Sequence, residues 1–422
     1  MIMQTRTTNH ITTIKTEKFK TTLIKVSFKA KLEQKTVTER ILLANVLRNS
    51  SEKFESKKIL SAHLEELYGA ALSVSTKKQG QLHIISFYIQ VANEKFLKSA
   101  PPLFEEALKT LGEIIMKPKI IEKSFDKQVV DLEGRLLKED IESVYDDKTS
   151  YALRKMFEHM CENENFGISG DGYIEDLEKI DEEKLIATYE SMLNNDDVSI
   201  VALGDIDHVK VINLLETHLN FKSQTRTQLS AVDQEEKEMR NVMDLDEKQL
   251  VSQTKLNIGY RTYTRVTDED YFALLVFNGV FGAFAHSKLF MNVREKESLC
   301  YYCTSQLDNF KGLLYVYSGL DIEQVSKATE IIDKQLDDIC CGHVTDKELE
   351  LSKKSITHAK RSSLDSASGM LAELEMSAIL GIGADEFIQK VEQVALADVI
   401  RVAKKIKKDI IFTLSPCAEV LA

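Results

Sequence analysis

The chain has 422 residues, of which 43% are apolar and 29% are charged, and its formal net charge is −12. This length is enough for two or more domains, and the acidic balance argues against non-specific nucleic-acid binding, which needs a basic surface. The first ten residues lack the apolar core of a signal peptide, and no stretch approaches the ~18 apolar residues of a membrane-spanning helix. We therefore expect a cytoplasmic protein that binds neither nucleic acid nor membrane.

The first half of the chain alternates between strand and helix patterns. Leu23–Leu32 alternates apolar and polar residues, which is the period of a half-buried strand, and the hairpin around Thr76–Gly80 carries a glycine turn. The other elements expected in this half are a helix through Thr38–Leu47, the helix Ser56–Tyr68, the strand Ile84–Val91, a helical pattern ending near Met116, the helix Glu182–Leu193 and the strand Val198–Leu203.

The second half of the chain repeats this order. The strand Leu250–Tyr260 shows the same alternation, and the strand Leu313–Gly319 leads into a long helical pattern, as Ile84–Val91 does. Near the C-terminus, the helix Leu396–Ile406 and the strand Ile410–Leu414 match the end of the first half. A period of about 220 residues indicates a domain duplication, because solenoid repeats span only about 20–50 residues.

Strands joined by hairpins predict a mostly antiparallel sheet with helices packed on one face. We therefore expect an α+β protein made of two homologous sandwich domains. The N-terminal domain would cover residues 1–222, and the C-terminal domain would cover residues 249–422. Between them, the polar segment 223–248 is rich in Gln, Glu, Asp and Asn, which is typical of an exposed linker.

Short motifs follow one another in order along nearly the whole chain. They are Glu52-Lys-Phe54 before a helix that closes on Leu67-Tyr-Gly69, then Asn165-Phe-Gly167, Val201-Ala-Leu-Gly-Asp205, and Ser287-Lys-Leu-Phe290 leading into Arg294-Glu-Lys-x-x-Leu299-x-Tyr301. In this order they resemble the pitrilysin/insulinase family, which includes mitochondrial processing peptidases. The resemblance implies the metallohydrolase fold of that family. Segments such as Glu142-Ser-Val-Tyr-Asp-Asp-Lys148 are also similar to a Gram-positive subgroup linked to aminopentanol modification of elongation factor P, a likeness that identifies no pathway.

The zinc-binding motif of this family is missing. Active members carry His-x-x-Glu-His on the first long helix, where the two His grip zinc and the Glu deprotonates the zinc-bound water, and a further Glu completes the site. The corresponding positions here hold Ile41, Leu42, Leu43, Ala44 and Asn45. No two of the nine histidines lie within four residues of each other, so neither His-x-x-Glu-His nor His-Glu-x-x-His exists in the chain. The sequence therefore predicts no metal site and no cofactor in this chain.

Three other groups of metal-ligating residues favour structural interpretations. His63-Leu-Glu-Glu66-Leu67 lacks the second His, and we interpret its His and Glu as a solvated surface pair. Glu133 falls where the third zinc ligand of the family would be, but a lone carboxylate does not hold zinc, so we expect an outward helix residue. Cys300-x-x-Cys303 has redox or zinc spacing without a second pair, and we expect buried thiols on a strand.

An Arg/Tyr pair of the second half does match the family. The resemblance implies that Arg294 and Tyr301, seven residues apart, act on a zinc site: the Arg binds the substrate backbone, and the Tyr stabilises the tetrahedral oxyanion. The structural alternative for Arg294 is a local ion pair, for which Glu297 at i+3 is better placed on a helix than Glu295. The structural alternative for Tyr301 is a strand residue that covers the core.

Two hypotheses for function follow. In the first, the chain is the non-catalytic partner subunit of a heterodimeric zinc peptidase: a zinc-bearing homologous subunit supplies the metal, and this chain supplies Arg294 and Tyr301 and helps to enclose a peptide substrate. The alternative is a catalytically dead structural or interaction homologue with no role in proteolysis. The Arg/Tyr pair favours the first hypothesis. An independent enzyme of another class is disfavoured, because the chain has no Walker loop, strand-linked dinucleotide fingerprint or Gly-x-Ser-x-Gly elbow.

Overall fold

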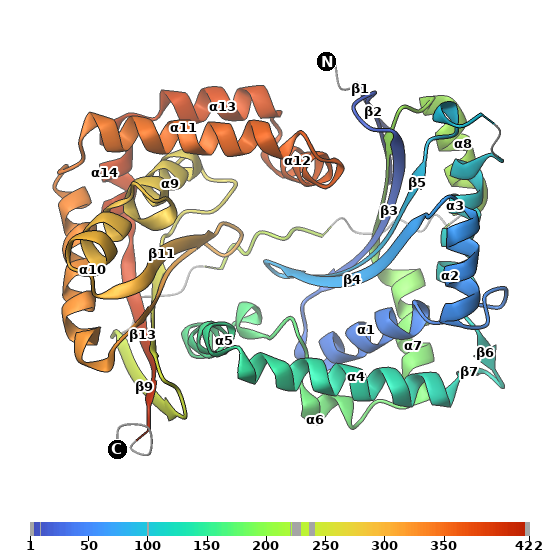
Figure 1. Cartoon of the computed structure of the whole chain (residues 1–422), viewed down its shortest axis with the longest axis horizontal. Helices are drawn as coiled ribbons and strands as arrows, with labels where there is room; N and C mark the ends of the chain where they lie inside the picture. Colours follow the sequence, from blue (N-terminus) through green and yellow to red (C-terminus); the bar gives the residue numbers. More distant parts are fainter. Residues whose placement is uncertain are drawn as a thin grey trace. The chain divides into compact units, whose positions relative to one another are not determined.

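Two sheets, one in each of two units, organise the chain (Figure 1). The computed structural model describes residues 4–8, 10–98, 101–219, 221, 229–235 and 241–417. The first unit comprises Met1–Glu142 and Ile168–Ser230, and the second comprises Ser143–Gly167 and Ala231–Ala422. Each unit is described by itself below.

The first unit contains a six-stranded sheet in the order β1-β2-β8-β3-β5-β4. Its neighbouring strands are antiparallel except for β2 and β8, which run parallel. A left-handed Gly80, with φ of 54°, turns β4 into β5 as the sequence predicts. The strands of this unit are β1 (Gln4–Thr8), β2 (Ile11–Lys15), β3 (Thr21–Lys31), β4 (Ala71–Gln79), β5 (Leu82–Ala92), β8 (Asp197–Gly204) and a separate pair, β6 (Ile120–Ile121) and β7 (Ser124–Phe125).

The helices of the first unit lie on one side of its sheet (Figure 1). The apolar core between them joins side chains of β3 and β5 to those of α1, α3 and α7. Asp181 caps α7, because its side chain accepts a hydrogen bond from the Lys184 backbone N–H at 2.8 Å. The helices are α1 (Gln34–Leu47), α2 (Lys57–Glu66), η1 (Glu94–Phe96), α3 (Leu103–Met116), α4 (Lys127–Asp146), whose last turn belongs to the second unit, α6 (Ile174–Leu177), α7 (Glu182–Asn195) and α8 (His208–His218).

The second unit repeats this topology with a five-stranded sheet in the order β11-β12-β10-β13-β9. Strands β9, β13, β10, β12 and β11 take the places of β2, β8, β3, β5 and β4, and the one parallel pair, β13 with β9, corresponds to β8 with β2. The predicted α+β duplication is therefore confirmed. The strands are β9 (Met243–Gln249), β10 (Thr254–Arg261), β11 (Cys300–Asp308), β12 (Leu313–Leu320) and β13 (Lys407–Pro416).

The helices of the second unit form the other half of its core, which joins β10 and β12 to α9, α10 and α14. No described helix is by itself long and apolar enough to cross a membrane, whereas the bent pair α12 and α13 passes that test on length and composition alone. The helices are α5 (Lys148–Met160), η2 (Asn165–Gly167), α9 (Tyr271–Asn278), η3 (Gly279–Ala283), η4 (Phe290–Lys296), η5 (Ile322–Gln324), α10 (Val325–Cys340), α11 (Asp346–Ser363), α12 (Ala367–Leu380), α13 (Ala384–Gln393) and α14 (Leu396–Lys405).

Helix α5 adds a layer that the sequence analysis did not predict. Its buried Met156 and Met160 pack on Ile410 and Phe412 of β13, on the sheet face opposite the main helices. The approach is close at Gly259, where an added Cβ would lie 2.6 Å from the Met160 sulfur. The second sheet is therefore covered on both faces, and the expectation of helices on one face holds for the first unit only. No local pattern signals this, because α5 precedes its sheet by about a hundred residues.

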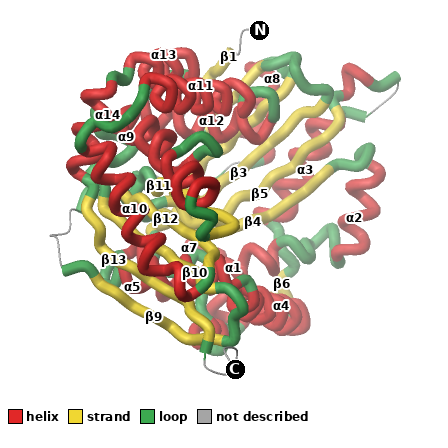
Figure 2. Tube along the Cα trace, turned by 60° about the vertical axis from the view of Figure 1, so that its left-hand side comes forward, coloured by secondary structure: helices red, strands yellow, loops and turns green. Residues whose placement is uncertain are grey.

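The predicted linker also needs correction. Residues 243–248 belong to β9, which runs beside β13 (Figure 2). The segment looks like a linker because alternate positions of this edge strand are exposed and polar, while Met243 and Leu245 pack on the α5 layer. Val232 and Asp233 are buried in the second unit as well. Of the rest of the predicted linker, residues 223–228 and 236–240 lie outside the described residues.

A buried charge cluster connects five segments of the second unit. Arg261 donates to Glu164 at 2.7 Å and to Asp409 at 2.7 Å, and Lys311 lies 2.5 Å from Glu164 and also pairs with Asp233. Burial raises the pKa of Glu164, but the hydrogen bonds from Arg261 and Lys311 outweigh it, and the pKa falls to about 2. The carboxylate therefore stays ionised at neutral pH and balances two buried cations.

A smaller buried polar group lies in the first unit. Arg40 of α1 lies 2.8 Å from Asp196 and donates from Nε to His83 Nδ1 at 3.2 Å. Burial and the charge of Arg40 lower the pKa of His83 to about 3, so this imidazole is neutral in the folded protein at neutral pH.

Candidate functional site

A pocket of about 440 Å³ lies in the second unit, where η4, the start of β11 and the end of β12 meet. The two residues singled out from the sequence, Arg294 and Tyr301, both line it. The complete lining is Arg294, Glu295, Ser298, Leu299, Cys300, Tyr301, Leu320 and Asp321.

Arg294 extends from η4, a π-helical segment. Its side chain is 42% exposed, its guanidinium lies over the Phe290 ring at 4.6 Å, and its Nε is 3.6 Å from Glu295. The expected partner Glu297 instead pairs with Lys327 at 2.7 Å. The expectation was wrong because π-helical turns close at i→i+5, which places residue i−4 rather than i+3 beside Arg294. The contact with Phe290 orients the guanidinium without neutralising it.

Tyr301 stands on a β-bulge at the start of β11. The pairing of β11 with β12 shifts between Cys300, opposite Leu320, and Tyr302, opposite Gly319, so Tyr301 is the extra residue. Tyr301 is 81% exposed, and its hydroxyl makes no hydrogen bond within the part of the chain that the structure describes. The alternative in which Tyr301 covers the core is therefore wrong.

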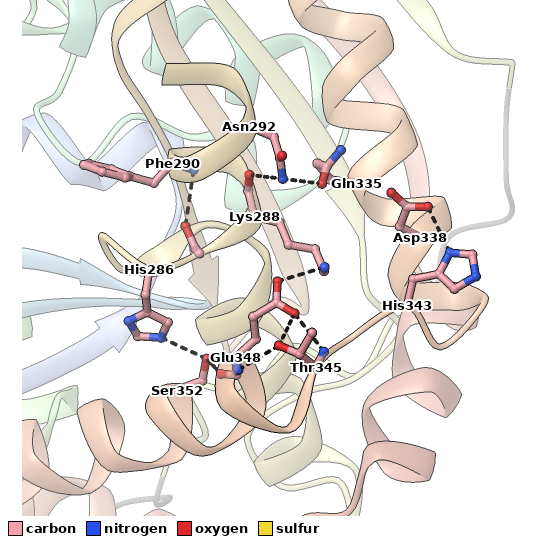
Figure 3. A network of polar contacts seen from close by, with 11 residues as sticks. His286, Lys288, Phe290, Asn292, Gln335, Asp338, His343, Thr345, Glu348 and Ser352 are labelled. Carbon is pink, nitrogen blue, oxygen red and sulfur yellow. Dashed lines mark hydrogen bonds and ion pairs between the residues drawn. The ribbon is translucent and has the colours of Figure 1, made fainter. Parts of the chain in front are cut away.

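Polar contacts hold the segment that carries Arg294 (Figure 3). Asn292 donates to the Lys288 carbonyl at 3.0 Å and to the Gln335 side chain on α10 at 2.8 Å. Lys288, itself buried, pairs with Glu348 of α11 at 2.9 Å. Glu348 also completes the capping box of α11 with Thr345. The π-helical segment is thereby fixed to two long helices, which sets where Arg294 leaves the backbone.

The thiols of Cys300 and Cys303 differ from each other in exposure. Cys303 is buried on the strand as expected, but Cys300 is only half-buried and lines the pocket. The residue pattern does not signal this exposure, because a bulge leaves no trace in the period-2 alternation from which strand burial is inferred. Phe290 was also missed, although its position four residues before an Arg is a recognisable pattern once the segment is known to be helical.

Four of the five zinc-motif positions of the first unit hold apolar side chains, and the fifth holds the half-buried Asn45. Ile41, Leu42, Leu43 and Ala44 on α1 are all buried, and they belong to the core of this unit. Among the described residues, no group of three or more His, Cys, Asp and Glu side chains is arranged to hold a metal ion. The residues at the family's zinc position therefore do not fit the metal.

Glu133 is not the outward residue that the sequence indicated. Its side chain is 1% exposed, accepts a hydrogen bond from Asn49 at 2.7 Å, and pairs with Lys57 at 2.9 Å. The prediction failed because the preceding residue on α4, Leu132, takes the exposed position instead. An ammonium group thus compensates the carboxylate that the family uses as a zinc ligand.

His63 also differs from its expected solvated pairing. The His63 ring lies 4.7 Å from the ring of Phe54, and its Nε2 is 2.9 Å from the Thr110 hydroxyl. Partial burial, followed by the charge of Lys53, lowers its pKa. His63 is therefore a packed structural residue, on a helix away from any second histidine.

Comparisons with known proteins agree on one family. A family model described as the Peptidase M16 inactive domain matches residues 179–356. The chain is 36% identical over 410 residues to the probable inactive metalloprotease YmfF of Bacillus subtilis (strain 168), covering 96% of this chain and 95% of that protein. A crystal structure of a conserved protein from Enterococcus faecalis V583 is 30% identical with a TM-score of 0.91, covering 98% of this chain and 99% of that one.

A more distant structure, the peptidase M16 inactive domain from Pseudomonas fluorescens, has a TM-score of 0.80 at 14% identity and covers 99% of each chain, which shows the shared fold alone. None of these names refers to elongation factor P, so that likeness stays a prediction. The near full-length similarity to YmfF agrees with the zinc-motif positions, which hold four apolar residues and Asn45. The chain therefore belongs to the M16 peptidase family, the pitrilysin/insulinase family of the sequence analysis, as an inactive homologue.

Proposed function

We propose that this chain is the non-catalytic subunit of a two-subunit zinc peptidase and supplies Arg294 and Tyr301 to the zinc site of a homologous partner. The observation that carries the proposal is that both side chains reach the same open pocket of the second unit. The first unit also supports the proposal, because four of its five zinc-motif positions hold buried apolar side chains and the fifth holds Asn45. A chain that keeps one half of a composite site and has lost the other half is the kind expected to need a partner.

The chemistry of the two side chains suits peptide hydrolysis. A phenol hydroxyl donates one hydrogen bond, and Tyr301 would donate it to the oxyanion that forms when water attacks a peptide carbonyl. A guanidinium fork binds carbonyl or carboxylate oxygens, and Arg294 would hold the substrate backbone in this way. The partner's zinc would activate the attacking water.

The local structure supports a functional role better than a packing role. An exposed Tyr301 contributes little to the core, and β-bulges commonly re-aim a side chain next to an active site. The Phe290 ring orients the Arg294 guanidinium, and the carboxylate of Glu295 is 3.6 Å from its Nε, beyond a close hydrogen bond. The donors of Arg294 therefore remain available to a substrate.

Zinc analysis of the isolated chain provides the first test. The purified chain should bind no stoichiometric zinc and should cleave no peptide, because no described residues form a ligand set. Plasma emission spectrometry after exhaustive dialysis measures this. About one tightly held zinc per chain would contradict the assignment of the metal to a partner.

Assembly provides the second test. The chain should be co-expressed with each homologue from the same genome that carries His-x-x-Glu-His, beginning with the product of any adjacent reading frame. We expect a heterodimer with an interface on the order of 2,000 Å² or more, as in obligate pairs. Light scattering that gives only separate monomers for every pair would contradict the proposal.

Kinetics on the reconstituted pair provide the decisive test. Tyr301→Phe should lower kcat by about 10²–10³-fold, the usual cost of one oxyanion donor, while keeping the ring. Arg294→Ala should raise KM as well as lower kcat. The matched controls are Tyr145→Phe and Arg361→Ala, two exposed residues of the same unit outside the pocket. Wild-type turnover in both pocket variants would remove this chain from the chemistry.

The second candidate function is an interaction protein without a proteolytic role. The similarity to a probable inactive metalloprotease favours it to the same degree as the first, since neither candidate hydrolyses peptides alone. The same experiments separate the two. An interaction protein would assemble with a partner while the pocket variants leave the partner's turnover unchanged.

A further inference from the structure

The two cysteines at the start of β11 lie on the same face of the sheet. In a regular strand, residues three apart point to opposite faces. Here Cys300 pairs with Leu320 and Cys303 pairs with Ser318, and residues 318 and 320 of β12 share a face. The bulge at Tyr301 therefore brings both sulfurs to one side of β11, next to the pocket.

The two thiols are chemically unequal. Cys303 is buried and donates a hydrogen bond to Cys300, whereas Cys300 is half-buried and lines the pocket. This hydrogen bond, opposed by burial and assisted by Ser318 and the charge of Arg294, lowers the pKa of Cys300 to about 7. The pKa of Cys303 moves up, because of the same hydrogen bond and its burial. At neutral pH about half of Cys300 is thus thiolate, the form that attacks disulfides.

The pocket around Cys300 carries charges of both signs. The guanidinium of Arg294 lies on one side, and the carboxylates of Glu295 and Asp321 also line the space. A pocket of about 440 Å³ accepts a ligand of amino-acid to short-peptide size. A ligand with both a carboxylate and an ammonium group complements this arrangement, since Arg294 can bind the first and Asp321 the second.

We propose that Cys300 is a site of thiol–disulfide exchange with small disulfides whose ends carry an α-carboxylate and an α-ammonium group. The Cys300 thiolate attacks one sulfur of the disulfide, an S–S bond forms to Cys300 as the original S–S bond breaks, and the displaced thiolate leaves and takes a proton from water. The small disulfide is the oxidant, so no other redox partner is required. The product is a mixed disulfide that fills the pocket beside Tyr301.

The exchange ends at this mixed disulfide. Across the bulge, Cys300 and Cys303 lie opposite β12 residues that are two apart, so their Cα atoms are about 7 Å apart, at the upper limit of the roughly 4.4–6.8 Å that a disulfide needs, and closing one would compress the strand. Cys303 therefore acts as a hydrogen-bond donor and a positioning residue rather than as a resolving thiol. If the proposed function holds, the adduct would occupy the space that a substrate carbonyl needs, and small disulfides would inhibit the assembled peptidase.

The test uses the full-length chain alone, so its outcome does not depend on the proposed peptidase partner. The reduced protein is treated with cystine, with cystamine, which has only ammonium ends, or with dithiodiglycolate, which has only carboxylate ends. Peptide mass spectrometry follows the adduct at Cys300 over time, with the exposed Cys341 of the same chain as the internal control. We expect Cys300 to react faster than Cys341, and cystine to be the best of the three reagents at Cys300 alone.

Four variants sharpen the result. Arg294→Gln should slow cystine and dithiodiglycolate more than cystamine, which loses only the effect of the Arg294 charge on the Cys300 thiol, and Asp321→Asn should slow cystine and cystamine but not dithiodiglycolate. Cys303→Ala should slow Cys300 roughly threefold, because a return of its pKa to about 8.5 lowers the thiolate fraction more than it raises nucleophilicity. Cys303→Ser keeps a donor and should restore most of the rate. Equal rates at Cys300 and Cys341, a cystine preference that survives Arg294→Gln, or an internal Cys300–Cys303 disulfide would each overturn the proposal.

Discussion

The two strands that take the same place in the duplicated sheets, β4 and β11, begin in different ways. In the first unit, Tyr68 and Gly69 both have positive φ, at 59° and 71°, and form a left-handed turn before β4, which then pairs with β5 in unbroken register. In the second unit, β11 begins at Cys300, and its pairing with β12 is bulged between Cys300 and Tyr302. The comparison teaches that the two units share the sheet topology and differ in the local backbone path. The bulge in the second unit is what presents the Tyr301 side chain at the pocket.

The position of the charged groups differs in a parallel way. The first unit buries Glu133 against Lys57 and Asn49, at the place where the family holds zinc. The second unit keeps its large buried cluster around Glu164 and Arg261, between the sheet and α5, and leaves Arg294 at the pocket. The first unit therefore buries the carboxylate at this position. The second unit has both a buried structural cluster of charged groups and one arginine, Arg294, at an open pocket.

The largest effect is expected from opening the buried cluster of the second unit. Glu164→Ala leaves Arg261 and Lys311 without their shared carboxylate, and removing one partner of a buried pair typically costs about 3–5 kcal/mol. Urea unfolding followed by circular dichroism measures the loss, and Glu162→Ala, at an exposed neighbour, is the control. A change below about 1 kcal/mol would mean that the cluster does not hold α5 to its sheet.

An intermediate effect is expected from acid on the first unit. His83 has a folded pKa of about 3 against a normal value of 6.5, so the unfolded chain binds a proton first, and stability is lost as the pH falls below 6.5. Between pH 6.5 and about pH 4.5 this loss should reach roughly 2–3 kcal/mol. The carboxylate of Glu164, with its pKa of about 2, should keep stabilising the second unit until the pH falls below about 4.5.

The His83→Gln variant isolates the contribution of His83 to the loss of stability in acid. It should flatten the pH dependence of the unfolding free energy between pH 6.5 and about pH 4.5, and it should leave the steeper loss at lower pH in place. Chemical denaturation at a series of pH values provides the measurement. An unchanged slope in the variant would show that other groups set the acid sensitivity.

The smallest effect is expected where Lys57 compensates Glu133. Lys57→Ala should cost about 1 kcal/mol, because Asn49 still donates to the carboxylate and the lysine is itself about half exposed. Lys58→Ala, at the next and exposed position, is the matched control. If the two variants had equal melting temperatures, the pairing of Lys57 with Glu133 would contribute nothing to the first unit.

Local sequence patterns predicted most of the helices and strands. The strand predicted at Leu23–Leu32 nearly coincides with β3. The helix and strand predicted at Glu182–Leu193 and Val198–Leu203 nearly coincide with α7 and β8, because each element buries one face against its own neighbours. Helix α5 and strand β9 escaped prediction for the opposite reason. Their partners lie far along the chain, and β9 shows its polar face at alternate positions.

The candidate site was predictable only in part. The spacing of Arg294 and Tyr301 identified both lining residues, because a motif records positions irrespective of backbone form. Their surroundings depend on a π-helical segment and a bulge, two departures from regular geometry that carry no period of their own. The prediction therefore gave Arg294 the wrong ionic neighbour and gave Cys300 the wrong exposure.

The place of α5 in the second unit has a consequence for synthesis on the ribosome. The helix ends at Met160, and its last sheet strand, β13, ends at Pro416, which is 256 residues later (416 − 160). At about 5–20 residues per second, α5 waits roughly 13–50 s for that strand. Its apolar face, which includes Met156, lacks Ile410 and Phe412 of β13 in that interval. The nascent chain should therefore depend on chaperones chiefly while its second half is being made, long after the strands of the first unit have emerged.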